Sequence, residues 1–402
     1  MWAEIDLSAI SSNLSVVRSR LSEKARIMLV VKADAYGHGA VEVARHVLAH
    51  GEAQAFGVGD SREALELREV GIDAPILILG AIVDGEMEAV IRNDIAVCVH
   101  SQSRVRRLES ESRRQRKRCR VHVMVDTGMG RLGPFPDKAY EVARTVAASD
   151  WLVLEGVATH FSSTQSDDDG FTREQIRRFE AFRGRLAEAG LDRPIFHSAN
   201  SGATLFEDAR ACDLVRVGAA AYGIFARHNG DAARLLPALT LRTQVIYLKD
   251  VPAGTPISYN RKHITERKTR IATLPIGYND GLSYGLSGIW HVLLRGQQAP
   301  IVGAISMDYC MIDVGHIPGV RSGEIVTVIG RDGQNHVSVP EIAEALGTVP
   351  YEITCMLGKR VQRLHFPDRP RPALLPALQA SAARDRSPAA APEFPAGVMQ
   401  QR

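Results

Sequence analysis

One lysine directly follows an apolar run near the N-terminus, and its position suits covalent or proton-transfer chemistry. Lys32 comes after Ile27–Val31, a run typical of a buried parallel strand. In a closed α/β barrel the carboxyl end of each strand lies at the active-site rim. Burial there would lower the pKa of the amine, and a neutral amine can form a Schiff base or accept a proton. A lysine whose ammonium extends into water fits the position equally well.

Two segments rich in small residues suggest an anion site. His197–Ala203 (HSANSGA) and Val215–Tyr222 (VRVGAAAY) each lie at the end of a short apolar run. Backbone N–H groups can approach an anion closely there, and Ser201 can add a hydroxyl at a predicted helix start. Barrels often bind phosphate at their last two strands, although tight turns alone explain such glycines about as well. Together with Lys32, these segments favour a carbonyl cofactor that carries a phosphate, and pyridoxal 5'-phosphate (PLP) fits.

Two further side chains follow apolar runs. His160 comes after Leu152–Ala158, and an imidazole there could stack on a flat ring or exchange protons, although a lone histidine is more often structural. Arg131 lies in Asp126–Gly133 (DTGMGRLG), where its planar guanidinium could hold a carboxylate. Structural turns are the alternative explanation for these glycines.

The elements that would position these residues alternate along the first part of the chain. Short, often β-branched apolar runs are separated by amphipathic helix-like segments such as 172–189. Eight such β/α units in about 220 residues match a (β/α)8 barrel, whereas an open doubly wound sheet would need fewer strands. The predicted strands are Ile27–Val31, Ala55–Val58, Ile76–Leu79, Ile95–Val99, Val121–Val125, Leu152–Ala158, Ile195–Phe196 and Leu214–Val217.

After Pro237 the pattern changes to strand-like runs separated by Gly, Pro, Asn and Asp turns. Among them, Leu239–Leu248 and Ala299–Ile305 are each predicted as one strand. We therefore expect a barrel over 1–236, with the first few residues packing against the second domain, and a mostly β domain over 237–366. The segment 367–402 is rich in Pro and Ala without periodicity and is predicted to be disordered.

Composition excludes several classes of protein. Hydrophobic residues make up 45% and charged residues 24% of the 402 residues, as is ordinary for a globular protein. Five scattered cysteines without a CxxC pair support neither a disulfide framework nor a metal site. No apolar run is long enough for a membrane span, and the acidic N-terminus resembles no secretory signal. A cytoplasmic location is the simplest expectation.

The charge is unevenly distributed. The net charge is +3, yet 104–120 contains nine basic and two acidic residues. This run lacks the interleaved aromatic residues that favour nucleic-acid binding. A solvated helix face is therefore the preferred interpretation, and no nucleic-acid partner is expected.

In this order, the motifs resemble those of PLP-dependent alanine racemases of the fold-type III class, over residues 2–366. The resemblance implies a (β/α)8 barrel, a C-terminal β domain, and a homodimer with shared active sites, in which the β domain of one subunit faces the barrel mouth of the other. Five segments carry it: Val31–Gly39 (VKADAYGHG), Asp126–Gly133, the HSANS run from His197, Pro275–Gly281 (PIGYNDG) and Ser306–Asp308 (SMD).

The resemblance also implies catalytic roles. Lys32 would carry the cofactor and act as one base, and Tyr259 of the partner subunit would act on the opposite face of the substrate. Two facing groups suit a reaction that removes a proton from one side of a carbon and returns it on the other. His160 would link Tyr259 to Arg216, and Arg216 would face the pyridine nitrogen.

The remaining contacts that the resemblance implies concern the phosphate, the substrate and the entrance. Arg131 and the backbone of Met307 would hold the substrate carboxylate, and Tyr278 and Asp308 would line the entrance. The phosphate would be held by Tyr36, Ser201, Tyr351 and the backbone of Gly218 and Ala219.

One position departs from the family pattern. The family commonly has a carbamylated lysine two residues before the Asp126–Gly133 segment, where this chain has Met124. Methionine cannot form a carbamate, so Arg131 would need another anion, such as chloride or a nearby carboxylate.

Several alternative functions must be distinguished within this resemblance. The leading one is interconversion of L- and D-alanine, and a racemase of serine or of wider range is the nearest rival. A non-catalytic PLP-binding protein would lack the β domain. A related PLP decarboxylase would be expected to have a cysteine in place of Tyr259.

Overall fold

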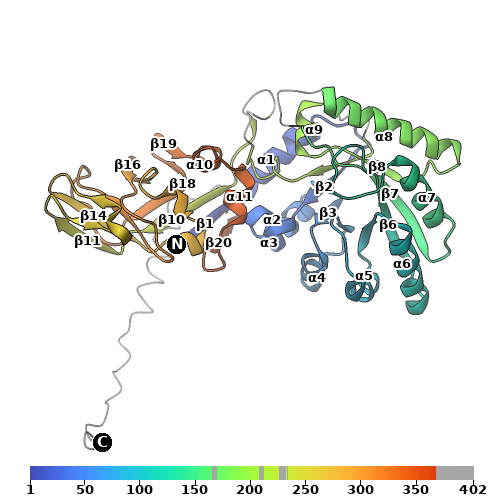
Figure 1. Ribbon diagram of the computed structural model, residues 1–402, viewed down its shortest axis with the longest axis horizontal. Coiled ribbons are helices and arrows are strands. Elements are labelled where there is room, and N and C mark those ends of the chain that lie inside the picture. Colours follow the sequence, from blue (N-terminus) through green and yellow to red (C-terminus); the bar gives the residue numbers. More distant parts are fainter. Residues whose placement is uncertain (165–169, 208–211, 226–231, 233, 368–402) are drawn as a thin grey trace, which may run out of the picture.

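The computed structural model describes residues 1–367 except 165–169, 208–211, 226–231 and 233. Its two lobes are an α/β barrel and a mostly β domain, with α2 and α11 lying between them (Figure 1). Apart from Pro367, the predicted disordered tail lies outside the described residues.

Eight parallel strands form the barrel sheet, in the order β8-β7-β6-β5-β4-β3-β2-β9. The two end strands approach each other, because the backbone N–H of Arg216 donates to the carbonyl oxygen of Ala199 at 2.9 Å. This arrangement confirms the predicted (β/α)8 architecture. The strands are β2 (Arg26–Val30), β3 (Ala55–Val58), β4 (Ile76–Ile78), β5 (Ala96–Val99), β6 (Cys119–Met124), β7 (Leu152–Ala158), β8 (Ile195–His197) and β9 (Leu214–Val217).

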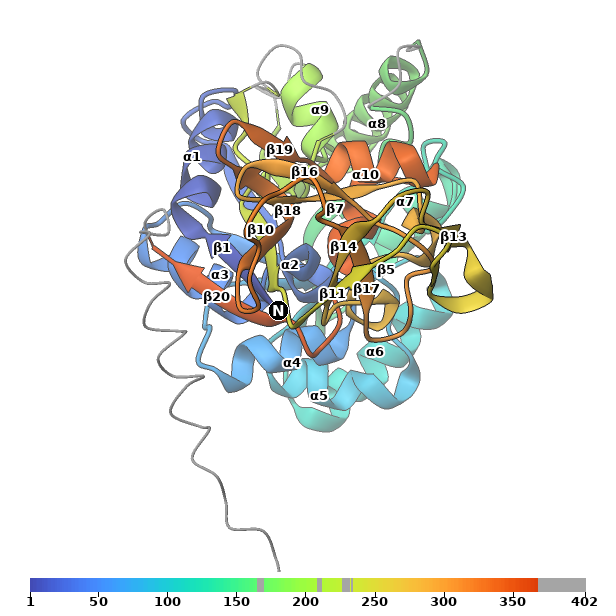
Figure 2. The same cartoon turned by 90° about the vertical axis from the view of Figure 1, so that its left-hand side faces the viewer.

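Helices surround the barrel strands, and Figure 2 shows several of them behind the β domain. Their apolar sides face the sheet; Phe179, Phe182 and Leu186, for example, are buried on one side of α8. Side-chain caps fix where some helices begin, as Asp60 does for α4. The helices are α1 (Leu7–Arg18), α2 (Lys32–Gly37), α3 (Ala40–Ala49), α4 (Ser61–Glu69), η1 (Asp84–Glu86), α5 (Met87–Arg92), α6 (Gln102–Gln115), α7 (Pro136–Ala147), α8 (Gly170–Glu188) and α9 (Ser201–Phe206).

The C-terminal domain is built on a seven-stranded sheet that contains both ends of the described chain. β1 (Trp2–Asp6) pairs antiparallel with β10 (Leu239–Gln244) and parallel with β20 (Gln362–Phe366). The rest of this sheet is formed by β15 (His291–Leu294), β16 (Gln297–Pro300), β18 (Ile325–Asp332) and β19 (Asn335–Val337).

The other elements of this domain are two small sheets and several short helices. β11 (Tyr247–Val251), β14 (Thr269–Leu274) and β17 (Cys310–Asp313) form one sheet, and β12 (Pro256–Ile257) pairs with β13 (His263–Ile264). The helices are η3 (Tyr259–Arg261), η4 (Tyr278–Asp280), η5 (Tyr284–Leu286), α10 (Val339–Leu346) and α11 (Pro350–Cys355).

Two strands predicted in this domain were wrong in extent. Leu239–Leu248 is divided between β10 and β11, because the chain crosses from one sheet to another. The backbone N–H of Val245 donates to the carbonyl oxygen of Glu324 at 2.8 Å, and that of Ile246 donates to the carbonyl oxygen of Thr273 at 3.0 Å. The strand predicted over Ala299–Ile305 ends at Pro300, and beyond it only an isolated bridge joins Ile301 to Ile312.

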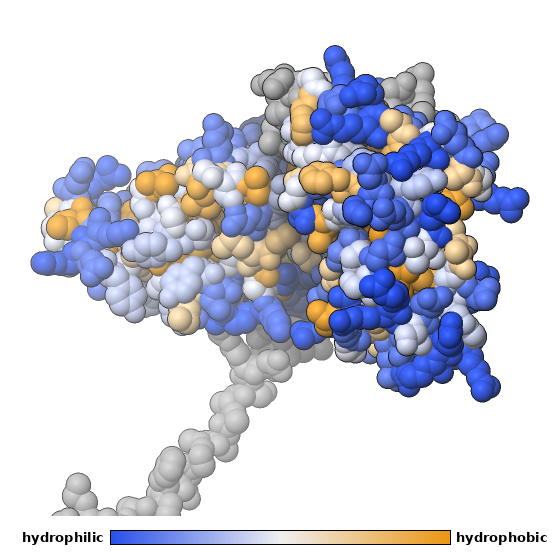
Figure 3. Space-filling view, turned by 45° about the vertical axis from the view of Figure 1, so that its right-hand side comes forward, coloured by the Kyte–Doolittle hydropathy of each residue, from blue (hydrophilic) through white to orange (hydrophobic). Residues whose placement is uncertain are grey.

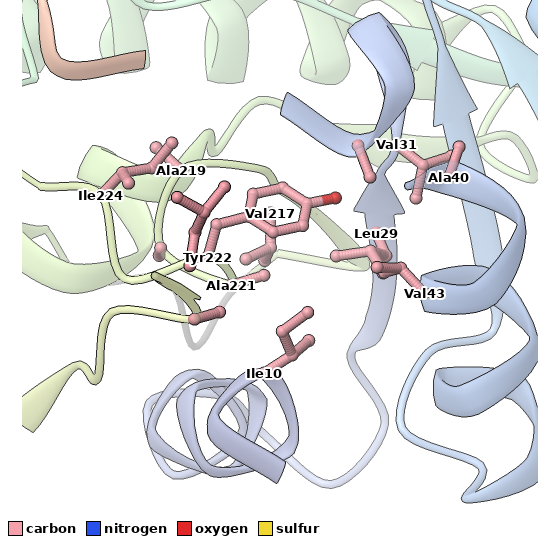
Figure 4. Close-up of a cluster of buried hydrophobic side chains, with 14 of the residues drawn as sticks. Ile10, Leu29, Val31, Ala40, Val43, Val217, Ala219, Ala221, Tyr222 and Ile224 are labelled. Carbon is pink, nitrogen blue, oxygen red and sulfur yellow. The ribbon is translucent and has the colours of Figure 1, made fainter. Parts of the chain in front are cut away.

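A compact apolar cluster lies beneath the lysine-bearing turn. Tyr222 is fully buried there, and its hydroxyl donates to the carbonyl oxygen of Val30 at 2.8 Å. Figure 4 shows its ring between Ile10 of α1, Leu29 of β2 and Val217 of β9. This packing fixes the end of β2 from which Lys32 extends.

The surface differs between the two lobes. Hydrophilic residues dominate the barrel helices, whereas apolar and hydrophilic residues are mixed over the C-terminal domain (Figure 3). Among the described residues, no helix combines the length and apolar character that crossing a membrane requires.

Candidate active site

A cavity of about 640 Å³ opens at the carboxyl ends of the barrel strands. Two of its lining residues, Tyr351 and Cys355, come from α11 of the C-terminal domain. The structure thus brings together these predicted site residues: Lys32, Tyr36, Arg131, His160, Ser201, Arg216, Gly218, Ala219 and Tyr351.

Lys32 begins an unusual left-handed turn. The four residues Ala33–Tyr36 have φ values between 52° and 57°, although none of them is glycine. Each such residue costs roughly 1–2 kcal/mol, so surrounding contacts must hold the turn in place. One is Glu63 of α4, whose carboxylate accepts from the N–H of Ala33 at 2.6 Å and from that of Gly59 at 2.7 Å.

The far end of the turn is held from both domains. His38 Nδ1 donates to the carbonyl oxygens of Ala35 and Tyr36, both at 3.0 Å. Gly37 lies so close to α11 that an added Cβ would be 2.1 Å from the carbonyl oxygen of Thr354. Only glycine fits this approach, and the φ of +85° at Gly37 favours glycine as well.

The surroundings of Lys32 favour its neutral amine. Desolvation at the barrel rim lowers the pKa of the Lys32 amine, and the positive charge of Arg131 lowers it further. The negative charge of Glu63 opposes this shift without cancelling it. Lys32 is therefore a better nucleophile and base near neutral pH than an ordinary surface lysine.

Arg216, on β9, lies in the wall of the cavity and is only 4% exposed. One terminal nitrogen contacts His197 Nδ1 at 3.0 Å, and the other donates to the carbonyl oxygen of Thr159 at 2.7 Å. Burial lowers the pKa of its guanidinium to about 10, so the group remains a cation at neutral pH. Because it accepts no proton or hydrogen bond, it presents fixed positive charge to the cavity.

His160 lies beside this cation. Its Nδ1 is 3.3 Å from Nη2 of Arg216, so that nitrogen must be the acceptor. Burial lowers the pKa of the His160 imidazole to about 3, and the charges of Arg216, Arg131 and Lys32 add to the shift. His160 is therefore neutral and carries its proton on Nε2.

The turns after β8 and β9 meet at one end of the cavity. The hydroxyl oxygen of Ser201 accepts from the backbone N–H groups of Gly218 at 2.9 Å and Ala220 at 3.3 Å. A Cβ on Gly218 would be 2.6 Å from the hydroxyl oxygen of Tyr36. Burial raises the pKa of the Tyr36 hydroxyl, which stays protonated as a donor. Hydroxyls and N–H groups thus converge as in anion sites.

Arg131 lies at the exposed side of the cavity, near Met124. The Met124 side chain is buried in an apolar group inside the barrel, with Leu132 packed against it. Within the ranges that the structure describes, no carboxylate forms an ion pair with Arg131. Arg131 therefore remains free to bind an anion.

Four predicted site residues lie elsewhere, on the surface of the C-terminal domain: Tyr259, Tyr278, Met307 and Asp308. They do not line the cavity of their own chain. Tyr259 is 71% exposed, and Met307 and Tyr278 are also exposed. The η4 segment binds the Met307 loop, since Asn279 N–H donates to the Met307 carbonyl oxygen at 3.2 Å, and Asp308 pairs with Arg360 at 2.7 Å.

The structure adds functional candidates that the sequence analysis did not identify. Glu63 and Cys355 lie beside Lys32, and Glu155 joins His122 below Arg216. One available signal was polarity inside apolar runs, because His122 and Glu155 interrupt predicted buried strands. No comparable signal marks Cys355.

The basic run mostly belongs to α6, and several of its arginines are paired. Arg104 contacts Asp84 at 2.7 Å, Arg107 contacts the same carboxylate, and Arg114 contacts Glu111 at 2.7 Å. These exposed pairs favour a solvated helix face over a nucleic-acid surface. No cluster of three or more His, Cys, Asp or Glu side chains suited to a metal ion occurs in the described part of the chain.

Fold and site together define a barrel enzyme with a lysine-centred cavity, a buried cationic wall and an attached β domain. Residues 5–225 match the model of the alanine racemase N-terminal domain, and residues 238–365 match that of the C-terminal domain. The chain therefore belongs to the alanine racemase family.

Individual relatives agree with this assignment. The alanine racemase of Methanococcus maripaludis is 39% identical over 369 residues, covering 91% of this chain and 98% of that protein. The alanine racemase of Halothermothrix orenii is 40% identical over 363 residues, which cover 90% of this chain and 96% of that protein. Solved structures also resemble this chain. Alanine racemase from E. faecalis has a TM-score of 0.84 at 35% identity, and the match covers 91% of this chain and 98% of that one. Alanine racemase from Bacillus anthracis with bound L-Ala-P has the same TM-score and identity, and the match covers 91% of this chain and 94% of that one.

Proposed function

We propose that this chain is a PLP-dependent enzyme that interconverts L- and D-alanine. The observation that carries the proposal is the position of Lys32, which has a depressed pKa and shares one cavity with Arg216 and Ser201, in a member of the alanine racemase family. The Bacillus anthracis relative, which has bound L-Ala-P, supports an alanine-like substrate.

The residues of the cavity fit the cofactor. Tyr36, Ser201, Tyr351 and the backbone of Gly218 and Ala219 would hold its phosphate, because all five residues line the cavity and the hydroxyls of Tyr36 and Ser201 both lie close to the backbone of Gly218. Lys32 would hold its carbonyl carbon, and His160 and Arg216 would pack against and face its ring. When bound, PLP withdraws electrons from the substrate and makes the Cα proton acidic.

Racemisation then requires two proton-transfer groups on opposite sides of one carbon. Lys32 supplies one of them. Tyr259 supplies the other from the partner subunit, and its 71% exposure in a single chain suits such a role. The active unit is thus a homodimer in which each barrel receives residues from the other subunit.

Arg216 and His160 have supporting roles. The guanidinium stays protonated at neutral pH, so it would keep the pyridine nitrogen facing it unprotonated and suppress side reactions. His160 would donate its Nε2–H to the partner's phenol and so connect that phenol to Arg216, whose Nη2 is 3.3 Å from His160 Nδ1.

The substrate carboxylate would be held by Arg131 and by the backbone of Met307 from the partner subunit. Tyr278 and Asp308 from that subunit would line the entrance. Because Met124 replaces an anion-forming lysine, a chloride ion is the proposed partner of Arg131.

The test is incubation of the purified holoenzyme with each L-amino acid in deuterated water, followed by chiral analysis. Deuterium at Cα with inversion for alanine is expected. A decarboxylated product, or inversion of serine but not of alanine, would overturn the proposal. As a matched control, Lys32→Ala should abolish both turnover and the visible absorbance of the bound cofactor.

A further inference from the structure

A row of hydrogen-bonded side chains crosses the barrel interior below Arg216. His197 Nε2 lies 2.8 Å from His122 Nδ1, and His122 Nε2 lies 3.0 Å from a carboxylate oxygen of Glu155. At the other end, His197 Nδ1 is 3.0 Å from Arg216. These groups lie on β9, β8, β6 and β7, of which β6, β7 and β8 are adjacent in Figure 1.

The two ends of this row fix every proton within it. Arginine can only donate, so Nδ1 of His197 must accept and its proton must be on Nε2. That proton is donated to Nδ1 of His122, whose own proton is therefore on Nε2. The carboxylate of Glu155 accepts it. The direction of donation thus runs from Arg216 to Glu155 without a break.

Burial makes this order costly to disturb. His122 is 3% exposed and His197 is fully buried, so an unpaired ring nitrogen could not turn to water. Burial also lowers the pKa of the His197 imidazole well below its usual value. Burial alone would raise the pKa of Glu155, but the hydrogen bond from His122 and the charge of Arg120 hold it below its usual value.

The backbone is shaped to place Glu155 in this row. The register between β6 and β7 shifts at this point, so that Val121 pairs with Leu154 and His122 with Gly156. Glu155 is the extra residue of this bulge, and bulges commonly redirect a side chain next to an active site. Gly156 makes room for the ring, because a Cβ there would be 2.2 Å from His122 Nδ1.

We propose that Glu155 is a positioning residue for the reaction: through His122 and His197 it fixes both imidazole tautomers, and so keeps His197 Nδ1 as the acceptor that orients Arg216. The inference rests on the proposed function for its consequence in catalysis. The proton order itself can be measured whether or not the protein racemises alanine.

The first measurement needs no variant. Neutron diffraction from crystals of the holoenzyme should show a proton on Nε2 and none on Nδ1 in both His122 and His197. A proton on Nδ1 of either residue would overturn the proposal, whatever the activity of the enzyme.

The second measurement distinguishes the effect of the hydrogen-bond acceptor at position 155 from the effect of side-chain packing there. Glu155→Leu removes the acceptor and should lower kcat for alanine roughly tenfold, with much less change in KM. Glu155→Gln keeps an acceptor oxygen and should restore most of kcat. Asp94→Asn is the matched control, because Asp94 also lies near Arg120 (3.9 Å) but makes no contact with His122. It should leave kcat unchanged.

The variants also give results that would contradict the inference. Equal loss of kcat in Glu155→Leu and Glu155→Gln would show that charge or packing matters rather than the acceptor. An unchanged kcat in a folded Glu155→Leu would show that Arg216 needs no support from the row. If none of the proteins racemises alanine but the neutron result holds, the proposed function fails and the proton order stands.

Discussion

The carbonyl oxygen of Gly37 accepts a hydrogen bond from Nε of Arg363, at 3.2 Å. Arg363 lies on β20, the last strand of the described chain, and Gly37 ends the left-handed turn that begins with Lys32. The same guanidinium donates to the carbonyl oxygens of Leu357, Gly358 and Val361. One side chain thus ties the C-terminal domain to the lysine-bearing turn of the barrel.

Arg363→Met should weaken this connection. The substitution leaves several partly buried carbonyl groups without their donor, which should lower the free energy of unfolding by about 2 kcal/mol. It should also speed loss of the cofactor, because the turn carrying Lys32 would be less restrained. Urea unfolding and the decay of visible absorbance would measure the two effects. Arg331→Met, at an exposed position of β18, should change neither; equal effects in both variants would refute the connection.

Gly37→Ala tests the contact between the turn and α11. The added methyl group would meet the carbonyl oxygen of Thr354 at 2.1 Å in addition to the strained φ of +85°. We expect a loss of at least roughly 2 kcal/mol in the free energy of unfolding, measured in urea.

Gly51→Ala is the matched control for that variant, because Gly51 has a φ of +67° but no atom within 4 Å of an added Cβ. It should cost only about 1 kcal/mol from the backbone alone. If the two variants lose the same stability, α11 does not pack tightly against the turn.

The barrel could be predicted from the sequence because its information is local. Each strand is a short apolar run, and the residues just after it lie at the rim: Lys32 directly follows its run, His160 is the second residue after its own, and both line the cavity. The first few residues were expected to pack against the second domain, but the strands with which they pair could not be identified in this way. β1 joins β10 and β20 through contacts more than 200 residues apart, and no local pattern reports such pairing.

The detailed backbone geometry of the site also could not be predicted from local sequence patterns. Nothing in the residue types of Ala33–Tyr36 indicates four left-handed residues in succession, since the turn is imposed by Glu63, His38 and α11. The bulge at Glu155 depends on register between two strands. Both features are set by tertiary contacts that override local preference.

The buried histidines predict loss of stability in acid. Burial lowers the pKa of the His38 imidazole to about 4, whereas the unfolded chain binds that proton near pH 6.5. Above about pH 6.5 neither state is protonated at His38. Between about pH 6.5 and 4 only the unfolded state takes up the proton, so the free energy of unfolding should fall by up to about 1.4 kcal/mol per pH unit for this group.

Urea unfolding at a series of pH values would measure this slope. His38→Gln should make the slope shallower by up to one proton, although it also removes the Nδ1 contacts to the turn and should lower stability at pH 7. A slope that is the same in the unsubstituted protein and in His38→Gln would mean that His38 binds its proton equally in the folded and unfolded states.

The freedom of Arg131 predicts that the reaction responds to chloride. Met124 offers no charge, and no carboxylate among the described residues pairs with Arg131, so a small anion is needed to fix the guanidinium that would hold the substrate. Replacing chloride with gluconate at constant ionic strength should therefore lower kcat, and titrating chloride back should restore it with saturation. An unchanged kcat after chloride is replaced would show that Arg131 is already held in place, by the protein itself or by the substrate carboxylate alone.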